Sequence, residues 1–216
     1  MPESEKAGAL FRRNLVENND RLKGGPPDLG EWDWLICPAW REIRHAFIHF
    51  QDWLVVLGCA ALLEYCVKDQ AYEAQYGLKW DGTERERFFT KTNLGNALRI
   101  CKEAGVIERI LSDQIFYFCR KKRDVISHMN VAAFGKDKVY PSMPEYHKHS
   151  DLLIIRENVT AQDNPIASKA AFWEAVNNLS CEMIEETYKI VILLYEDTIK
   201  RASRGELGGG AIYTSK

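Results

Sequence analysis

The apolar stretch Trp53–Leu63 most limits what this chain can fold into. It lies inside residues 38–75, where only Gly58 interrupts a helical pattern. Apolar residues recur there at i+3 and i+4 spacing and cover nearly the whole circumference of the expected helix. A helix that is apolar on all sides is normally buried by other helices. Because Glu64 ends the run well short of the roughly 20 residues that a membrane span needs, we expect the centre of a helical bundle.

Further helices are predicted on both sides of this centre from the same spacing of apolar residues. The predicted helices cover residues 4–20 (a weak pattern), 94–101, 107–129 and 165–202. Asn93, or Thr92 before it, can cap the short second helix, and Asn164 followed by Pro165 is typical of a helix start.

Residues 132–163 lack a helical period and are punctuated by glycine and proline. Within them, residues 151–156 are a possible short strand. We therefore expect an all-α fold, an antiparallel four- to five-helix bundle with a long loop insertion before the last helix.

Three regions follow from these patterns. Residues 1–37 form an N-terminal helix and linker, residues 38–203 form the helical bundle with its insertion at 132–163, and residues 204–216 are a glycine-rich flexible tail.

The composition excludes few classes of function. Lys and Arg number 29 against 31 Asp and Glu, so the net charge of -2 indicates no general affinity for nucleic acid, and any basic surface must be local. The six cysteines contain no CxxC pair and mostly fall in apolar helical patterns, where a reduced cysteine behaves as a small hydrophobic residue. Without a secretory signal, a reducing cytoplasmic location is expected.

Buried acids and clustered aromatics suggest specific contacts. Glu64 is the one acid in the apolar centre, and a buried carboxylate needs a partner, for which an arginine of another helix is suitable. Trp32, Trp34 and Trp40 lie close together in the sequence. Large aromatics are mostly packing residues, and stacking on a base is the alternative.

The densest basic run lies in the predicted helix 107–129 and precedes a histidine. At 100° per residue, one face of this helix is apolar and carries Leu111, Ile115, Phe118, Val125, Ile126 and Met129. The other side is polar and carries Arg120, Arg123, Asp124, Ser127 and His128. Phe116 and Tyr117 also lie on the polar side, which indicates that a partner, most simply a second copy of the chain, covers part of it.

These residue types suit RNA cleavage without a metal ion. A histidine can move a proton near neutral pH, and an arginine can stabilise charge on a phosphate. Asp124 and His128 are i, i+4 neighbours, so the carboxylate can orient the imidazole. Arg123 and His128 are about 140° apart on a regular helix, so one copy does not bring them squarely together.

The remaining polar residues of this segment are candidates for binding the RNA backbone and its hydroxyl groups. They are Arg120, Lys121, Lys122, Ser127 and Asn130.

The segment Arg123–His128 resembles the R-x4–6-H signature of the HEPN superfamily, in which Asn, Asp or His often follows the arginine. The setting is similar: a long helix with Leu62-Leu63-Glu64, a short helix, a break at 105–107, and a helix that ends in the signature. The resemblance covers about residues 40–200. It implies a helical bundle, a homodimer with both motifs in a shared cleft, and often metal-independent ribonuclease activity. By this likeness Arg123 and His128 are the catalytic pair, with Asp124 as their polar neighbour.

The resemblance leads us to expect an endoribonuclease that acts as a toxin or a phage-defence effector. Its partners would be RNA and an antitoxin or defence-system protein, with no cofactor, no metal and no membrane. One position departs from the family: HEPN toxins paired with minimal nucleotidyltransferases carry a tyrosine where this chain has Asn130, so control through that tyrosine is not expected. The insertion at 132–163 is also absent from the minimal bundle.

Two other interpretations stay open. Several HEPN proteins are non-catalytic, so the same basic face can serve a nucleic-acid-binding or protein-assembly module. A metal-dependent enzyme is the other, because His45 and His49 are i, i+4 neighbours flanked by Glu42 and Asp52, a spacing that can hold a divalent metal.

Overall fold

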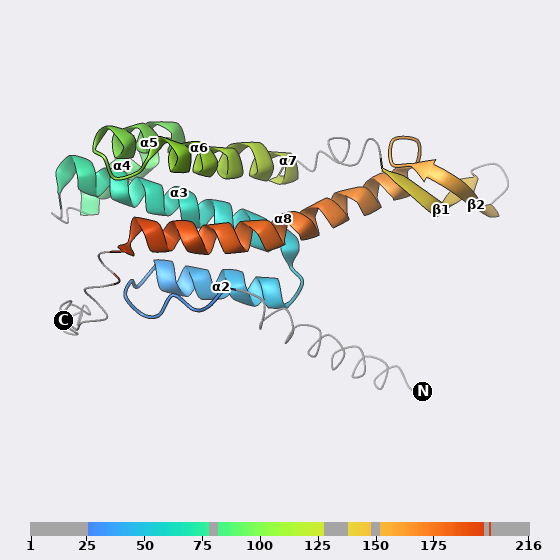
Figure 1. Cartoon of the computed structure of the whole chain (residues 1–216), viewed down its shortest axis with the longest axis horizontal. Helices are drawn as coiled ribbons and strands as arrows, with labels where there is room; N and C mark the ends of the chain where they lie inside the picture. Colours follow the sequence, from blue (N-terminus) through green and yellow to red (C-terminus); the bar gives the residue numbers. More distant parts are fainter. Residues whose placement is uncertain (1–25, 78–81, 128–137, 148–151, 197–198, 200–216) are drawn as a thin grey trace.

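The computed structural model describes residues 26–77, 82–127, 138–147, 152–196 and 199. This part of the chain is mostly helical and includes one two-stranded sheet (Figure 1). The predicted N-terminal helix at 4–20 and the predicted tail at 204–216 lie outside the described residues.

Helix α3 (Asp52–Tyr76) is the centre of the fold, as its apolar sequence predicts. Helices α2 (Ile36–Ile48), α5 (Leu94–Glu103) and α8 (Pro165–Leu194) all pack against it. In Figure 1, α3 lies between α8 and the segment from α5 to α7. The buried side chains of α3 are Val55, Val56, Cys59, Ala60, Leu62, Leu63, Cys66, Val67, Asp69, Ala71 and Tyr72.

The single helix expected over residues 38–75 is wrong, because the structure divides it into α2 and α3. The break is at Phe50, whose φ of 55° lies in the left-handed region, and the N–H of Gln51 turns back to the carbonyl of Ala46 at 2.9 Å. Gly58 has another role. A Cβ atom there would lie 2.8 Å from Cγ1 of Ile43, so glycine permits the close packing of α3 on α2.

The expected helix over 107–129 is not a uniform α-helix. It consists of α6 (Arg109–Phe116), a π-helix η1 (Tyr117–Lys122) and α7 (Arg123–Ser127). Before it, α4 (Gly82–Lys91) leads to α5, which Asn93 caps by accepting a hydrogen bond from the N–H of Asn96 at 2.9 Å.

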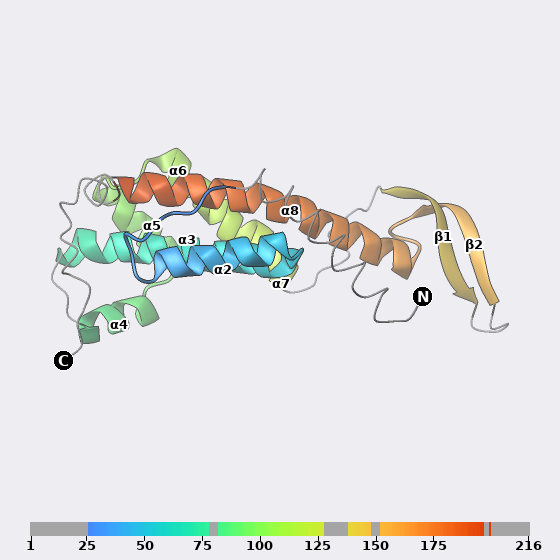
Figure 2. The ribbon, with the colours of Figure 1, turned by 90° about the horizontal axis from the view of Figure 1, so that it is seen from below.

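Helix α8 begins as the sequence predicts. The side chain of Asn164 accepts hydrogen bonds from the N–H groups of Ile166 at 2.8 Å and Ala167 at 3.1 Å, and Pro165 occupies the first turn. The bounds of α8 end at Leu194, and the expected helix end at residue 202 lies outside the described residues. Helix α8 packs along α3 and then extends beyond the other helices (Figure 2).

The long loop expected at 132–163 is wrong over most of its described part, which forms a β-hairpin. Strand β1 (Val139–His147) pairs with strand β2 (Leu152–Thr160) in antiparallel register, with Met143 opposite Arg156. The predicted short strand at 151–156 falls largely within β2. The fold is therefore mainly α rather than all-α, and Figure 2 shows the hairpin beyond the start of α8, away from the other helices.

Five of the six cysteines are buried as free thiols, and Cys181 is half-buried. Burial raises the pKa of Cys59 and of Cys119 to about 12, so these thiols act as hydrophobic packing residues, as the sequence predicts. Within the described part of the chain, none of the helices combines the length and the apolar character needed to cross a bilayer.

Candidate functional site

Arg123 is the first residue of α7, directly after the π-helix. Its N–H donates a hydrogen bond to the carbonyl of Phe118, five residues earlier. The π-turn lets both Phe118 and Cys119 face the core, and the Cys119 thiol donates to the carbonyl of Ala60 in α3 at 3.6 Å. π-helical turns inside α-helices occur frequently at functional sites. The angular positions expected for a regular helix therefore do not apply across Tyr117–Lys122.

The Arg123 guanidinium is held by two carboxylates. Its Nη1 donates to Glu64 of α3 at 3.4 Å, and its Nε and Nη2 donate to one oxygen of Asp124 at 3.0 Å and 2.8 Å. Partial burial opposes the charge of Arg123, but the hydrogen bond with Asp124 and the charges of Asp124 and Glu64 outweigh it and raise the pKa of Arg123. The arginine is therefore charged and fixed in orientation.

Glu64 joins this arginine to a second cation. Lys68, one turn further along α3, donates to Glu64 at 2.9 Å, and its Nζ also donates to the carbonyl of Phe89 in α4 at 3.3 Å. The prediction that Glu64 pairs with an arginine of another helix is confirmed. We call Glu64, Lys68, Arg120, Arg123 and Asp124 the Arg123 cluster.

Asp124 was predicted to orient His128. In the structure it accepts hydrogen bonds from Arg123, and Arg120 lies 4.0 Å from its other oxygen. His128 and Asn130 lie outside the described residues, so the pairing of Asp124 with His128 stays a prediction.

The other candidate RNA-binding residues differ in their surroundings. Lys122 forms an ion pair with Glu182 of α8 at 2.5 Å, and this pair connects η1 to α8. Ser127 is exposed, and its hydroxyl donates to the carbonyl of Asp124 at 3.1 Å. The side chain of Lys121 lies outside the described part of the chain, and RNA contact by any of these residues stays a prediction.

Two aromatic side chains beside the cluster are open to solvent. Phe116 is 42% exposed and Tyr117 is 51% exposed. Exposed aromatics next to a basic segment form a surface that a partner or an unstacked base can cover.

The metal site proposed at His45 and His49 receives no support. The two rings lie 4.3 Å apart between centroids, but Asp52 accepts hydrogen bonds from Ser180 at 2.5 Å and Asn177 at 2.9 Å. Among the described residues, no group of three or more His, Cys, Asp or Glu side chains could hold a metal ion.

A second polar cluster on α3 is not predicted by the sequence pattern. Asp69 of α3 is buried, accepts a hydrogen bond from the hydroxyl of Tyr195 at 2.7 Å, and pairs with Arg85 of α4. Arg85 also donates to the Tyr65 hydroxyl at 2.9 Å. Burial raises the pKa of Asp69 even though Tyr195 and Arg85 act in the opposite direction. The available signal was an acid between buried positions of the same helix. We call Asp69, Arg85, Tyr65 and Tyr195 the Asp69 cluster.

The three tryptophans near the N-terminus have different environments. Trp40 is fully buried and donates its indole N–H to the carbonyl of Pro27 at 3.0 Å. Trp32 is partly buried, with its ring centroid 5.0 Å from that of Tyr195, whereas Trp34 is 69% exposed. Core packing is thus confirmed for Trp40, and Trp34 alone of the three is open for stacking.

Comparison with known proteins adds no relative to these observations. No protein-family model, no curated protein and no solved structure matches the chain. The likeness to the HEPN superfamily therefore depends on the signature residues and their helical setting.

Proposed function

We propose that the chain is a metal-independent endoribonuclease of HEPN type, acting as a toxin or phage-defence effector. A 2′-oxygen of the RNA forms a bond to the adjacent phosphorus while the bond from phosphorus to the 5′-oxygen breaks. The proton of the 2′-OH passes to a base, and the departing 5′-oxygen receives a proton from an acid. His128 serves as acid and base, and Arg123 stabilises the charge on the phosphate oxygens.

The anchoring of Arg123 is the observation that carries this proposal. Glu64 and Asp124 hold its guanidinium from two sides while its side chain stays 24% exposed. A prearranged arginine loses less conformational entropy when it binds a phosphate. A phosphate that replaces Asp124 would meet two parallel donors, Nε and Nη2, which is the bidentate geometry that favours arginine–phosphate pairs.

The proposed active form is a homodimer of antiparallel helical bundles, paired through the helix that carries Arg123 and His128. The exposed rings of Phe116 and Tyr117 support it, because association would remove this apolar surface from water. An antitoxin or defence-system protein is a second proposed partner.

The test is RNA cleavage by the purified chain in the presence of a chelator. Wild type should yield products with 2′,3′-cyclic phosphate or 3′-phosphate ends. His128→Ala should lower the rate by about a hundredfold or more, since general acid–base catalysis typically contributes that much. Arg109→Ala, which removes an 84% exposed cation from α6, is the matched control and should cleave as wild type does.

Equal cleavage by His128→Ala and wild type would show that the catalytic assignment is wrong. Circular dichroism of both variants excludes loss of fold as the cause of a lower rate.

A non-catalytic module that binds nucleic acid or assembles with protein is the second candidate. One observation favours it: carboxylates of the chain already pair with Arg123, and Glu182 already pairs with Lys122. This candidate predicts RNA binding that weakens steeply with salt and leaves no cleavage products.

A further inference from the structure

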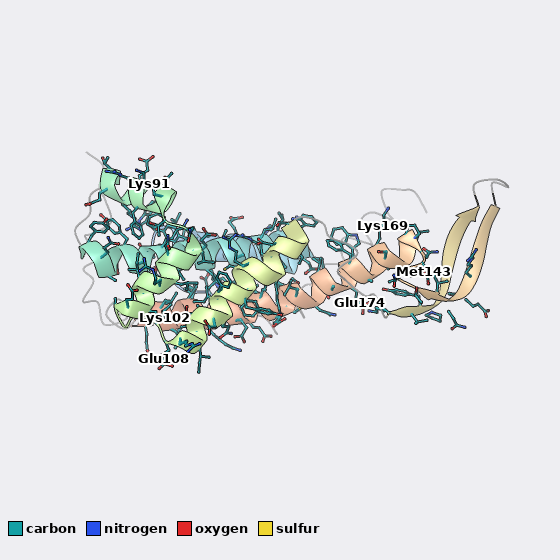
Figure 3. All side chains as sticks on the ribbon, turned by 90° about the horizontal axis from the view of Figure 1, so that it is seen from above. Lys91, Lys102, Glu108, Met143, Lys169 and Glu174 are labelled. Atoms are coloured by element: carbon teal, nitrogen blue, oxygen red, sulfur yellow. The ribbon has the colours of Figure 1, made fainter. Side chains whose placement is uncertain are left out.

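A hollow of about 660 Å³ lies where the C-terminal end of α3 meets α4 and α5. Three cations line it: Arg87 and Lys91 of α4, and Arg99 of α5. Glu84 is the one acid among its described lining residues, and Glu103 pairs with Arg99 at 3.1 Å, so the net positive charge of the lining comes from Arg87 and Lys91. Figure 3 shows Lys91 at the end of α4, on the side of α3 away from α8. A local excess of positive charge in a chain of net charge -2 favours an anionic ligand.

The rest of the lining suits a nucleotide chain better than a bare anion. Gln75 and Asn96 supply amide groups, and Tyr76 is 37% exposed. The Tyr76 ring is supported edge-on by the buried Phe88, at 6.0 Å between centroids and 84° between planes. A fixed, partly exposed aromatic ring beside cations is the usual arrangement for stacking an unpaired base while the backbone is held electrostatically.

The hollow and the Arg123 cluster lie on the same side of α3. Glu64, Lys68 and Gln75 are spaced four and seven residues apart, so their side chains fall within about 40° of one another around the helix. Glu64 and Gln75 are separated by about 16 Å along the axis at 1.5 Å per residue. Lys68 of the Arg123 cluster donates to the carbonyl of Phe89, and the neighbouring Phe88 lines the hollow, so α4 connects the two sites.

We propose that the hollow holds the backbone of the RNA substrate a few nucleotides away from the bond cleaved at Arg123. Most of its lining side chains are exposed, whereas a site for a small molecule encloses most of its ligand. An open, positive groove is suited to a strand that enters and leaves. The proposal rests on the proposed ribonuclease function and specifies its substrate as a single strand that spans both sites.

The test compares a double variant, Arg87→Ala with Lys91→Ala, against a control that removes two cations elsewhere, Arg109→Ala with Lys169→Ala. Binding is measured by fluorescence anisotropy with a non-cleavable 2′-O-methyl RNA of about 12 nucleotides and with a dinucleotide. The double variant should bind the long RNA about tenfold more weakly than wild type. Its affinity for the dinucleotide should equal that of wild type. The slope of log K against log salt should fall by about 1.4, since each single-strand phosphate contact contributes about 0.7.

Long-RNA binding and salt slope equal to those of the control would overturn the proposal. So would inorganic pyrophosphate binding as tightly as the long RNA and depending on Arg87 and Lys91, because the hollow would then be a site for small anions. Failure of the ribonuclease function appears separately, as absence of cleavage of unmodified RNA by wild type while the binding difference between the two double variants persists.

Discussion

Two arginines of this chain pair with carboxylates of α3, but their surroundings differ. Arg85 and Asp69 have side chains that are 14% and 9% exposed, and aromatic rings cover the guanidinium, with its carbon 5.1 Å from the Phe89 ring centroid. Arg123 and Glu64 are 24% and 28% exposed, and their contacts continue outward to Asp124. A buried arginine–carboxylate pair thus fixes the helices that it joins. A partly exposed pair is accessible to another anion.

An arginine in a binding site can exchange its carboxylate partner for a ligand, whereas an arginine that only joins helices cannot. In the proposed ribonuclease a phosphate competes with Asp124 for Arg123, and the side chain of Asp124 is 35% exposed, so it can turn toward water. For Arg85 the same exchange would leave the buried carboxylate of Asp69 without its cation, which is costly.

The largest expected effect is on stability, at the Asp69 cluster. Asp69→Ala should lower the free energy of unfolding by about 3–5 kcal/mol, because Arg85 loses its carboxylate partner and the buried hydroxyl of Tyr195 loses its acceptor at 2.7 Å. Asp124→Ala in the Arg123 cluster should lower the free energy of unfolding by about 0–1 kcal/mol, as for solvent-exposed pairs. Urea unfolding followed by circular dichroism measures both. Equal losses of stability at the two positions would remove the distinction between the buried Asp69 cluster and the more exposed Arg123 cluster.

Much of the fold, and part of this comparison, could be predicted from the sequence. The apolar run in α3 and the Asn164-Pro165 start of α8 are local signals, and each is found where it was expected. The break at Phe50 could not be predicted, since a phenylalanine with positive φ has no local signature and is imposed by the packing of α2 on α3.

The hairpin and the π-helix were missed for different reasons. Pro141 and Pro144 argue against a strand unless it is an edge, and a two-stranded sheet consists of two edges. A π-turn depends on which carbonyl each N–H selects, so the residue pattern of η1 does not reveal it.

The two clusters show the same limit at the level of side chains. Glu64 was found because it ends a long apolar run, and its arginine partner followed from the cost of burying a charge. Asp69 lies beyond that run, among polar neighbours in the sequence, and it is buried only because α4 and Tyr195 cover it.

The second expected effect is a pH dependence of the free energy of unfolding that arises from the Asp69 cluster. Burial raises the pKa of Asp69, so the native state binds more protons than the unfolded state between the unfolded pKa of about 3.9 and the folded value. The stability that Asp69 contributes is therefore full below pH 4 or so and is lost as the pH rises through its folded pKa. Relative to Asp69→Asn, wild type should lose stability over that range in urea titrations.

Asp28 supplies a control of opposite sign. Although slight burial acts to raise it, the pKa of Asp28 is lowered by its hydrogen bond with Arg41. Wild type should therefore gain stability relative to Asp28→Asn as the pH rises above the folded pKa of Asp28 and lose it in acid. Parallel pH profiles for wild type and both variants would contradict the assignment of these shifts.

The smallest expected effect concerns the replacement of Asp124 by a phosphate in the Arg123 cluster. If Asp124 competes with phosphate for Nε and Nη2 of Arg123, then Asp124→Asn removes a charge that opposes the ligand. Affinity for a non-cleavable 2′-O-methyl RNA should rise about 1.4- to fivefold, which corresponds to the roughly 0.2–1 kcal/mol of an exposed ion pair. Asp113→Asn, at a 71% exposed aspartate paired with Arg109, removes the same charge from α6 and should change the affinity less. Weaker RNA binding by Asp124→Asn would mean that Asp124 positions Arg123 for the ligand instead of competing with it, because the fixed orientation of the guanidinium would then matter more than the charge removed.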